Sequence, residues 1–271
     1  MTGLLGVIGD PVAHSLSPYI HNYWLREHGI NAVYAALEVK TGELAASLGS
    51  LLAHEAIGLN VTLPHKEEVL RLAARASDTA RRLGAANTLS RTGEGTWEAD
   101  NTDAPGFALT LDYGDIAVEG REVFLLGAGG SARAVADVLA RRGARLTICN
   151  RTMARAEALA LDLAPAARIL PLEDGLKQAD RASVVINTLS LGHGGGRLTL
   201  PESAGGIFYD ISYGKGAAAS LAEAQRKGWR TLDGLGMLVA QASLSFKLWF
   251  GVTPDLATAH TRARSLLEAT R

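Results

Sequence analysis

Short apolar runs rich in β-branched residues alternate with longer segments of helical periodicity along the first hundred residues. Residues 4–8, 32–39 and 57–61 have the length and composition of buried strands. Residues 18–28 and 43–53 carry apolar positions at helical spacing. This β-α-β-α-β order predicts a parallel sheet, because each crossover helix returns the chain to the same end of the sheet. Ligands of such sheets bind beyond the carboxyl ends of the strands.

A second series of the same kind follows a polar, glycine-containing stretch at residues 112–120, which indicates a domain junction. Its predicted strands are residues 122–126, 145–149, 182–187 and 207–211. Its predicted helices are residues 131–142, 153–163, 217–227, 235–249 and 254–267. Residues 193–196, His-Gly-Gly-Gly, indicate a flexible loop. The pattern predicts an α/β protein of two domains.

The most specific local motif is a glycine-rich turn between a predicted strand and a predicted helix. It consists of Gly127, Ala128, Gly129, Gly130, Ser131 and Ala132. A strand, a turn of this type and a helix, in that order, are typical of dinucleotide-binding domains. The glycines let backbone N–H groups approach a pyrophosphate at the positive end of the helix. The alternative is a glycine-rich turn without a ligand.

The second strand of this unit indicates which dinucleotide binds. A site for NAD places Asp or Glu near the end of that strand, where it accepts a hydrogen bond from the ribose 2′-hydroxyl. Residues 148–152 contain no carboxylate and instead include Asn150, Arg151 and Thr152, with Arg155 one turn later. A guanidinium pairs with a 2′-phosphate, so the sequence favours NADP. The alternative for the two arginines is a solvated helix start.

Polar residues also follow the predicted strands of the first domain. Ser15 and Ser17 precede a helix that has Pro18 in its first turn. Ser17 as a simple N-cap is the structural explanation, whereas two hydroxyls at a helix N-terminus also suit a carboxylate ligand. Further polar segments are residues 60–66 (NVTLPHK), 84–88 (GAANT) and 100–103 (DNTD). Each of them alone is also typical of turns.

Together with GAGGSARA at 127–134, NRT at 150–152 and GMLVAQA at 236–242, these motifs resemble the shikimate dehydrogenase family over nearly the whole chain. The resemblance implies an NADP-dependent enzyme that reversibly reduces 3-dehydroshikimate to shikimate, on the route to chorismate and the aromatic amino acids. It also implies two α/β domains with a cleft between them. Residues 1–103 plus 240–271 would form a parallel-sheet domain for substrate binding and catalysis, and residues 104–239 a Rossmann-type NADP-binding domain.

The resemblance also assigns residues to roles, position by position. It implies that Lys66 and Asp103 are the catalytic pair. The implied substrate contacts are Ser15, Ser17, Asn60, Thr62, Lys66, Asn87, Asp103, Tyr213 and Gln241. The implied cofactor contacts are Gly127, Ala128, Gly129, Gly130, Ser131, Ala132, Asn150, Arg151, Thr152, Arg155, Thr188, Gly234 and Met237.

The residue types of the implied catalytic pair suit this chemistry on their own. Hydride transfer to a ketone leaves a developing alkoxide, which a positioned ammonium such as that of Lys66 protonates. Asp103 would orient the ammonium by a charge-assisted hydrogen bond. The sequence departs from the family pattern at Ala86, at residues 187–193 and at Gly214-Lys215, whereas the Lys66 and Asp103 positions are intact.

Composition excludes several other classes of function. The chain has 27 Lys plus Arg against 28 Asp plus Glu, a formal net charge of −1, and 6% aromatic residues. Neither nucleic acid nor an anionic membrane is therefore expected as a partner. The single cysteine, Cys149, and histidines without ligand spacing predict no metal site and favour a reducing, cytoplasmic location. We expect a small-molecule substrate and a monomer or homodimer.

Three other functions stay open at this point. A quinate or quinate/shikimate dehydrogenase would act on a substrate with one more hydroxyl and could use NAD, but Arg151 favours NADP, and the Ser15 and Ser17 pair favours shikimate. A non-catalytic NADP-binding sensor would need neither Lys66 nor Asp103. A methylene-tetrahydrofolate dehydrogenase-like enzyme would have a similar architecture, and the paired serines and the DNTD motif argue against it.

Overall fold

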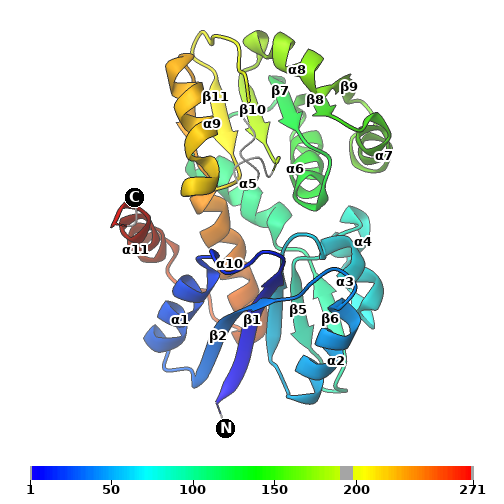
Figure 1. Ribbon diagram of the computed structural model, residues 1–271, viewed down its shortest axis with the longest axis vertical. Coiled ribbons are helices and arrows are strands. Elements are labelled where there is room, and N and C mark those ends of the chain that lie inside the picture. The colour runs from blue at the N-terminus through cyan, green and yellow to red at the C-terminus, as the bar shows by residue number, and fades with distance from the viewer. Residues whose placement is uncertain (1, 190–197, 270–271) are drawn as a thin grey trace. The chain divides into compact units, whose positions relative to one another are not determined.

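The computed structural model describes residues 2–189 and 198–269 (Figure 1). The chain forms two compact units, residues 1–106 plus 238–266 and residues 107–237 plus 267–271. The partition falls within helices α5 (Asp103–Tyr113) and α10 (Leu235–Phe250). The expected boundaries, after residues 103 and 239, lie in the same two helices. The flexible loop expected at residues 193–196 lies outside the described residues.

The first unit contains a six-stranded sheet in the order β2-β1-β3-β5-β6-β4. Its strands are β1 (Gly3–Gly9), β2 (Ala32–Glu38), β3 (Gly58–Val61), β4 (Arg75–Ala76), β5 (Thr88–Arg91) and β6 (Trp97–Asp100). The predicted parallel pairing of β1 with β2 and β3 is confirmed. The sheet then becomes mixed, because β5 runs antiparallel to both β3 and β6.

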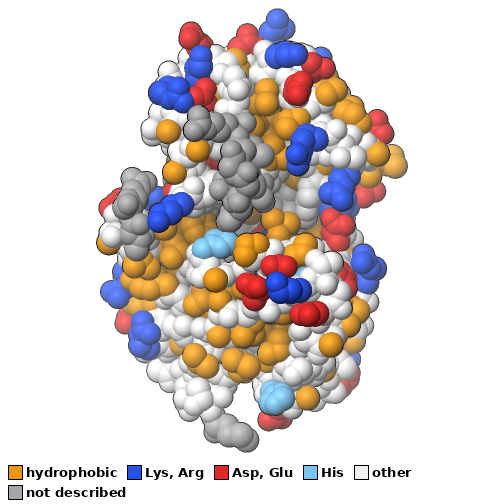
Figure 2. Space-filling view, in the orientation of Figure 1, with side chains coloured by type: hydrophobic (Ala, Val, Ile, Leu, Met, Phe, Trp, Pro, Cys, Tyr) orange, Lys and Arg blue, Asp and Glu red, His pale blue; other side chains and the backbone are white. Residues whose placement is uncertain are grey.

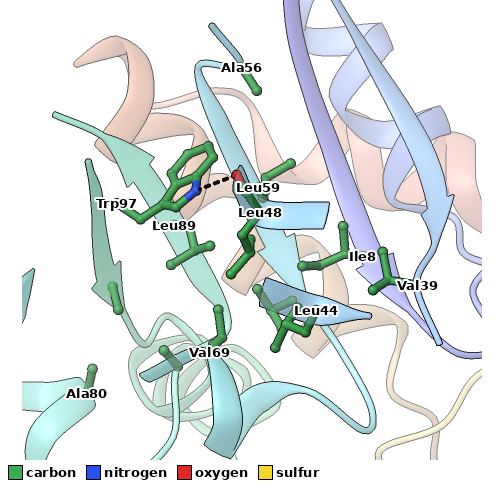
Figure 3. Packing of buried hydrophobic residues seen from close by; sticks show 13 residues of the cluster. Ile8, Val39, Leu44, Leu48, Ala56, Leu59, Val69, Ala80, Leu89 and Trp97 are labelled. Atoms are coloured by element: carbon green, nitrogen blue, oxygen red, sulfur yellow. Dashed lines mark hydrogen bonds between the residues drawn. The ribbon is translucent and has the colours of Figure 1, made fainter. Parts of the chain in front are cut away.

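Helices cover both faces of this sheet (Figure 1). They are α1 (Ser17–Glu27), α2 (Leu44–Ala53), α3 (Lys66–Leu72), α4 (Asp78–Leu83) and α10. Helix α11 (Leu256–Ala269) contacts α1, where Arg262 lies over the ring of Tyr23. Figure 3 shows Leu44 and Leu48 of α2 beside Leu59 and Leu89 of the sheet in one buried apolar cluster. The indole nitrogen of Trp97 donates to the Leu48 carbonyl across 3.2 Å in this cluster.

Strand alternation sends the neighbouring side chains to the opposite face, towards α1 and α10. There the ring of His21 stacks on Tyr34 at a centroid distance of 4.2 Å, and Trp24 meets Phe246 edge-on at 5.7 Å. Burial lowers the pKa of His21 to about 3, so this ring is neutral at physiological pH. A Cβ atom on Gly58 would overlap Trp249, so only glycine fits at this point of β3.

The second unit contains a six-stranded, wholly parallel sheet in the order β12-β11-β10-β7-β8-β9. Its strands are β7 (Glu122–Leu126), β8 (Arg145–Asn150), β9 (Arg168–Pro171), β10 (Val184–Asn187), β11 (Ile207–Asp210) and β12 (Arg230–Leu232). Its helices include α6 (Gly130–Arg141), α7 (Met153–Leu163), α8 (Leu172–Gln178), the 3-10 turn η1 (Ala179–Arg181) and α9 (Lys215–Arg226). Numbered from β7, this strand order is that of a Rossmann fold, as expected.

Cys149 lies on β8, the strand next to the edge strand β9 of this second sheet. Its side chain is fully buried, and burial raises the pKa of its thiol to about 12. The thiol therefore stays protonated, which confirms the interpretation of Cys149 as a core residue of the strand. A Cβ atom on Gly175 of α8 would overlap the Cys149 sulfur, so this helix lies close against the strand.

The surface carries both signs of charge. On the face shown in Figure 2, basic and acidic side chains are interspersed over each unit. Among the described residues, no helix combines the length and the apolar character needed to cross a lipid bilayer.

Candidate functional site

A first candidate site lies where the connections of the first sheet diverge. Strand β1 lies between β2 and β3, so the loops that leave β1 and β3 run to opposite sides, a place where α/β sheets bind ligands. Two backbone hydrogen bonds join these loops: Asp10 N–H donates to the Leu63 carbonyl and Thr62 N–H to the Ile8 carbonyl, both at 2.9 Å. Ser15 lies in the first loop, and Lys66 begins α3 after the second.

Lys66 and Asp103 form a buried ion pair at this edge. The Lys66 ammonium lies 2.5 Å from Asp103 Oδ2, and the two side chains are 9% and 6% exposed. Two hydrogen bonds hold the backbone around Lys66 in place. The Lys66 carbonyl accepts from Ala86 N–H at 2.8 Å, and the preceding residue, His65, donates its Nε2–H to the Val39 carbonyl at 2.5 Å. The charge of each partner therefore meets an opposite charge in a site with little water.

Asn87 orients the Asp103 carboxylate from the other side. Its Nδ2 donates to Asp103 Oδ1 at 2.8 Å and lies 3.2 Å from Gln241 Oε1, while its Oδ1 accepts from Thr102 N–H at 2.7 Å. The antiparallel direction of β5 places Asn87, which precedes this strand, at the same edge as Lys66. Asn101 completes the arrangement, because its Oδ1 accepts from Asp103 N–H at 3.0 Å at the start of α5.

The two predicted serines have a different arrangement from the one expected. Helix α1 begins at Ser17 itself and its N-cap is Leu16, whose side chain makes no capping hydrogen bond, so the alternative explanation of Ser17 as a simple N-cap is wrong. Ser15 Oγ instead accepts from Ser17 N–H at 3.2 Å. Thr62 lies over β1, since a Cβ atom on Gly9 would overlap its methyl group. Ser15 and Thr62 are half-buried, and Ser17 is buried.

A second candidate site is the glycine turn after β7, at the point where the Rossmann sheet reverses its strand order. Gly127 has a φ of +113°. A Cβ atom there would also overlap Thr188 Oγ1, because Thr188 donates both its N–H and its hydroxyl to the Leu126 carbonyl at 2.9 and 2.7 Å. A Cβ atom on Gly129, just before α6, would have no atom of the described residues within 4 Å. The turn therefore has a tightly packed first glycine and an open second one, as a bound pyrophosphate requires.

The predicted phosphate-binding arginine lies at the end of β8. Asn150 is buried and turns its Nδ2 to the Thr152 carbonyl at 2.9 Å, which shapes the turn into α7. Arg151, Thr152 and Arg155 are exposed there, and the described first turn of α7 contains no acidic residue. Two cations beside a helix N-terminus suit an anionic ligand, so these residues fit a 2′-phosphate.

Further predicted cofactor residues lie after β10 and β12. Asn187 ends β10 and donates to the buried Asp210 carboxylate at 2.9 Å, and burial raises the pKa of this carboxyl group. Gly234 lies so close to the Ile211 carbonyl that a Cβ atom would overlap it. Packing alone therefore requires glycine at this position, whether or not a cofactor binds there. Met237 is buried and Tyr213 half-buried, both in the second unit.

Comparison with known proteins decides the family. Three family models match the chain: the shikimate dehydrogenase substrate-binding domain over residues 7–89, shikimate / quinate 5-dehydrogenase over residues 112–193, and the shikimate 5′-dehydrogenase C-terminal domain over residues 234–264. A relative from Hyphomonas neptunium, named shikimate dehydrogenase (NADP(+)), is 70% identical over 100% of both chains. The chain belongs to the shikimate dehydrogenase family.

Solved structures of shikimate dehydrogenases share the whole fold. The enzyme from Aquifex aeolicus aligns with a TM-score of 0.86 and 34% identity, covering 97% of this chain and 98% of that one. The enzyme from Thermus thermophilus, solved in complex with NADP(H) and shikimate, aligns with a TM-score of 0.83 and 34% identity, covering 97% and 99%.

In this member of the family, the structure joins some of the predicted site residues directly and not others. Lys66, Asn87, Asp103 and Gln241 are linked by the contacts above, and Asn60 reaches them through the Asn87 carbonyl, to which its Nδ2 donates at 3.2 Å. Ser15 and Thr62 lie on the adjoining loops, and Ser17 is the first residue of α1. Their roles as substrate contacts stay predictions. Within the described residues, no group of three or more His, Cys, Asp or Glu side chains could hold a metal ion.

Besides Asn101, three buried hydroxyl residues near the ion pair were not predicted as site residues: Thr88, Thr102 and Ser245. Thr88 and Thr102 belong to the GAANT and DNTD motifs, but the sequence does not indicate that their side chains point into the protein. Ser245 follows Gln241 by four residues, the spacing of neighbours on one helix face, and this is the signal that could have found it.

The two glycines of the turn give opposite expectations for stability. We expect Gly127→Ala to lower the melting temperature by several degrees, because the new methyl overlaps Thr188 and a positive φ strains alanine. Gly129→Ala should leave the melting temperature unchanged, since its methyl enters open space. Thermal unfolding of the two variants without cofactor measures this difference. Equal melting temperatures would contradict the described turn.

Proposed function

We propose that this chain catalyses the reversible, NADP-dependent reduction of 3-dehydroshikimate to shikimate. The buried Lys66–Asp103 pair carries the proposal, because it places a proton donor and its orienting carboxylate at the ligand-binding edge of the first sheet. Membership of the shikimate dehydrogenase family supports the same reaction. The substrate site would lie on the first unit and the cofactor site on the second.

The role of Lys66 follows from the charge that reduction creates. When NADPH is bound it supplies the hydride that reduces the carbonyl carbon. The carbonyl oxygen gains negative charge, and the Lys66 ammonium stabilises this oxygen and transfers a proton to it. In the oxidation direction the neutral amine takes the hydroxyl proton back. Asp103 Oδ2 directs the amine, and Asn87 keeps Asp103 from rotating by holding Oδ1.

The remaining polar side chains divide into two groups by chemistry. Ser15, Ser17 and Thr62 supply hydroxyl donors beside a helix N-terminus, a combination that suits the carboxylate of shikimate. Asn87 and Gln241 lie with the ion pair and suit the ring hydroxyls. Tyr213, a residue of the second unit, is a further proposed substrate contact. One lost partner in such a buried network costs about 1–3 kcal/mol, which is enough to discriminate related polyols.

The cofactor site is assigned by charge and space. The open position at Gly129 suits the pyrophosphate, and Arg151 with Arg155 suits the 2′-phosphate. Thr188, Gly234 and Met237 would line the nicotinamide end. A cytoplasmic location and a monomeric or homodimeric state stay predictions of the sequence.

Initial rates with shikimate or quinate, each paired with NADP+ or NAD+, test the proposed activity. We expect reduction of the nicotinamide largely with shikimate and NADP+. Comparable rates with quinate or with NAD+ would favour the broader quinate/shikimate activity. A chain that binds NADP+ but reacts with neither substrate would be a sensor, and the proposal would be wrong.

Lys66→Gln tests the proton donor. Glutamine keeps an N–H for Asp103 but transfers no proton, so we expect kcat for shikimate oxidation to fall about 10²- to 10⁴-fold. The dissociation constant for NADP+ should stay within about twofold, because Lys66 belongs to the first unit and the proposed cofactor site to the second. The matched control is Lys40→Gln, an exposed lysine of the same unit, which should keep normal activity. Retention of kcat in Lys66→Gln would exclude the assigned role.

Arg151→Ala tests the choice of cofactor. Loss of a charge-assisted contact to the 2′-phosphate should raise KM for NADP+ about 10- to 100-fold and leave KM for NAD+ unchanged. Arg181→Ala, at an exposed arginine elsewhere in the same unit, serves as the control. Steady-state kinetics with both cofactors give the comparison. An equal rise for NADP+ and NAD+ would show that Arg151 does not recognise the 2′-phosphate.

A further inference from the structure

A buried polar cluster lies under the catalytic pair on the α10 side of the first sheet. It consists of Tyr34, Asn60, Thr88, Thr102 and Ser245, all of which are at most 4% exposed. Strand alternation explains its position, because Leu59 and Leu89 face the apolar cluster of Figure 3, so their neighbours Asn60 and Thr88 face α10. Ser245 meets them from this helix, one turn after Gln241.

The hydrogen bonds of Asn60 fix which end of its amide faces which partner. Its Nδ2 lies 2.9 Å from Ser245 Oγ and 3.2 Å from the Asn87 carbonyl, which can only accept. Thr88 Oγ1, at 3.3 Å, is a third acceptor for the same two hydrogens. The Oδ1 atom of Asn60 accepts from the Tyr34 hydroxyl at 2.7 Å. Both amide hydrogens are therefore committed inside the protein, so any hydrogen bond from Asn60 to a ligand would be made through Oδ1, the end of the amide that meets the Tyr34 hydroxyl beside the His21 ring.

Ser245 joins this amide to the residues around the ion pair. The Ser245 oxygen accepts from Asn60, so its hydroxyl proton is free to be donated to one of three acceptors. These are the Gln241 carbonyl, Thr88 Oγ1 and Thr102 Oγ1, which lie 3.1, 2.8 and 3.1 Å from Ser245 Oγ. The Thr102 backbone in turn donates to Asn87 Oδ1, and Asn87 holds Asp103. The hydroxyl of Ser245 is thus the shortest acceptor for Asn60 and a direct neighbour of the residues that orient the carboxylate.

On the basis of the proposed function, we propose that Ser245 is a positioning residue that locks the Asn60 amide with only its oxygen available to the substrate. Asn60 then accepts a hydrogen bond from a ring hydroxyl and does not bind the substrate carboxylate, which would need a donor. Without Ser245, Nδ2 keeps only its two longer contacts, and the amide loses the partner that opposes rotation.

Ser245→Ala tests this role, with Ser243→Ala as the matched control. Both serines are buried on α10, but the Ser243 hydroxyl donates to the Ala240 carbonyl of its own helix, at 2.8 Å. We expect Ser245→Ala to raise KM for shikimate about three- to tenfold, with KM for NADP+ within about twofold of the unmodified chain. Ser243→Ala should change neither constant.

A double-variant cycle with Asn60→Ala separates positioning from a general loss of stability. If Ser245 acts through Asn60, Ser245→Ala adds less than about twofold to KM for shikimate once Asn60 is alanine. Independent effects that multiply would overturn the proposal. So would an unchanged KM for shikimate in Ser245→Ala, or an equal rise of both KM values. Absence of shikimate oxidation by the unmodified chain would instead contradict the proposed function itself.

Discussion

The site depends on how one buried carboxylate is satisfied. Asp103 receives the Lys66 ammonium on Oδ2 and the Asn87 amide on Oδ1, so each oxygen has a donor from a different element. Burying the carboxylate without one of these partners would destabilise the fold. The free-energy cost of removing a charge from water exceeds the stabilisation that a single contact provides. The same two bonds that make burial tolerable also set the direction of the ammonium. Stability and chemistry therefore rest on one arrangement.

The topology explains why these partners meet. Lys66 follows a strand at its carboxyl end, and Asp103 follows β6, which runs in the same direction as β3 because the antiparallel β5 lies between them. Asn87 precedes β5 and so reaches this edge from the opposite direction. In the second unit the Gly127 turn and Thr188 lie at the equivalent edge of a fully parallel sheet. Each unit thus presents its polar residues where its own strand order reverses.

Much of this could be predicted from the sequence, and the exceptions have physical reasons. Apolar, β-branched composition predicted β1, β2 and β3, although only Tyr34 is buried in β2 and β3 includes the polar Asn60. It did not predict β5, whose partner is antiparallel and whose first residue, Thr88, points inward to another polar group. The alternative explanation of Ser17 as an N-cap was wrong because the helix begins one residue earlier than a serine cap requires. Ser245 could not be predicted because its partners Asn60 and Thr88 lie on strands distant in sequence.

The central claim of the proposed mechanism is that Lys66 transfers the proton. The most direct test is the pH dependence of the initial rate in both directions, with saturating NADP+ and shikimate or with NADPH and 3-dehydroshikimate. Oxidation requires a neutral amine to take the hydroxyl proton and reduction requires the ammonium to give it. The account predicts that the oxidation rate climbs with pH while the reduction rate does not. Parallel profiles in the two directions would contradict it.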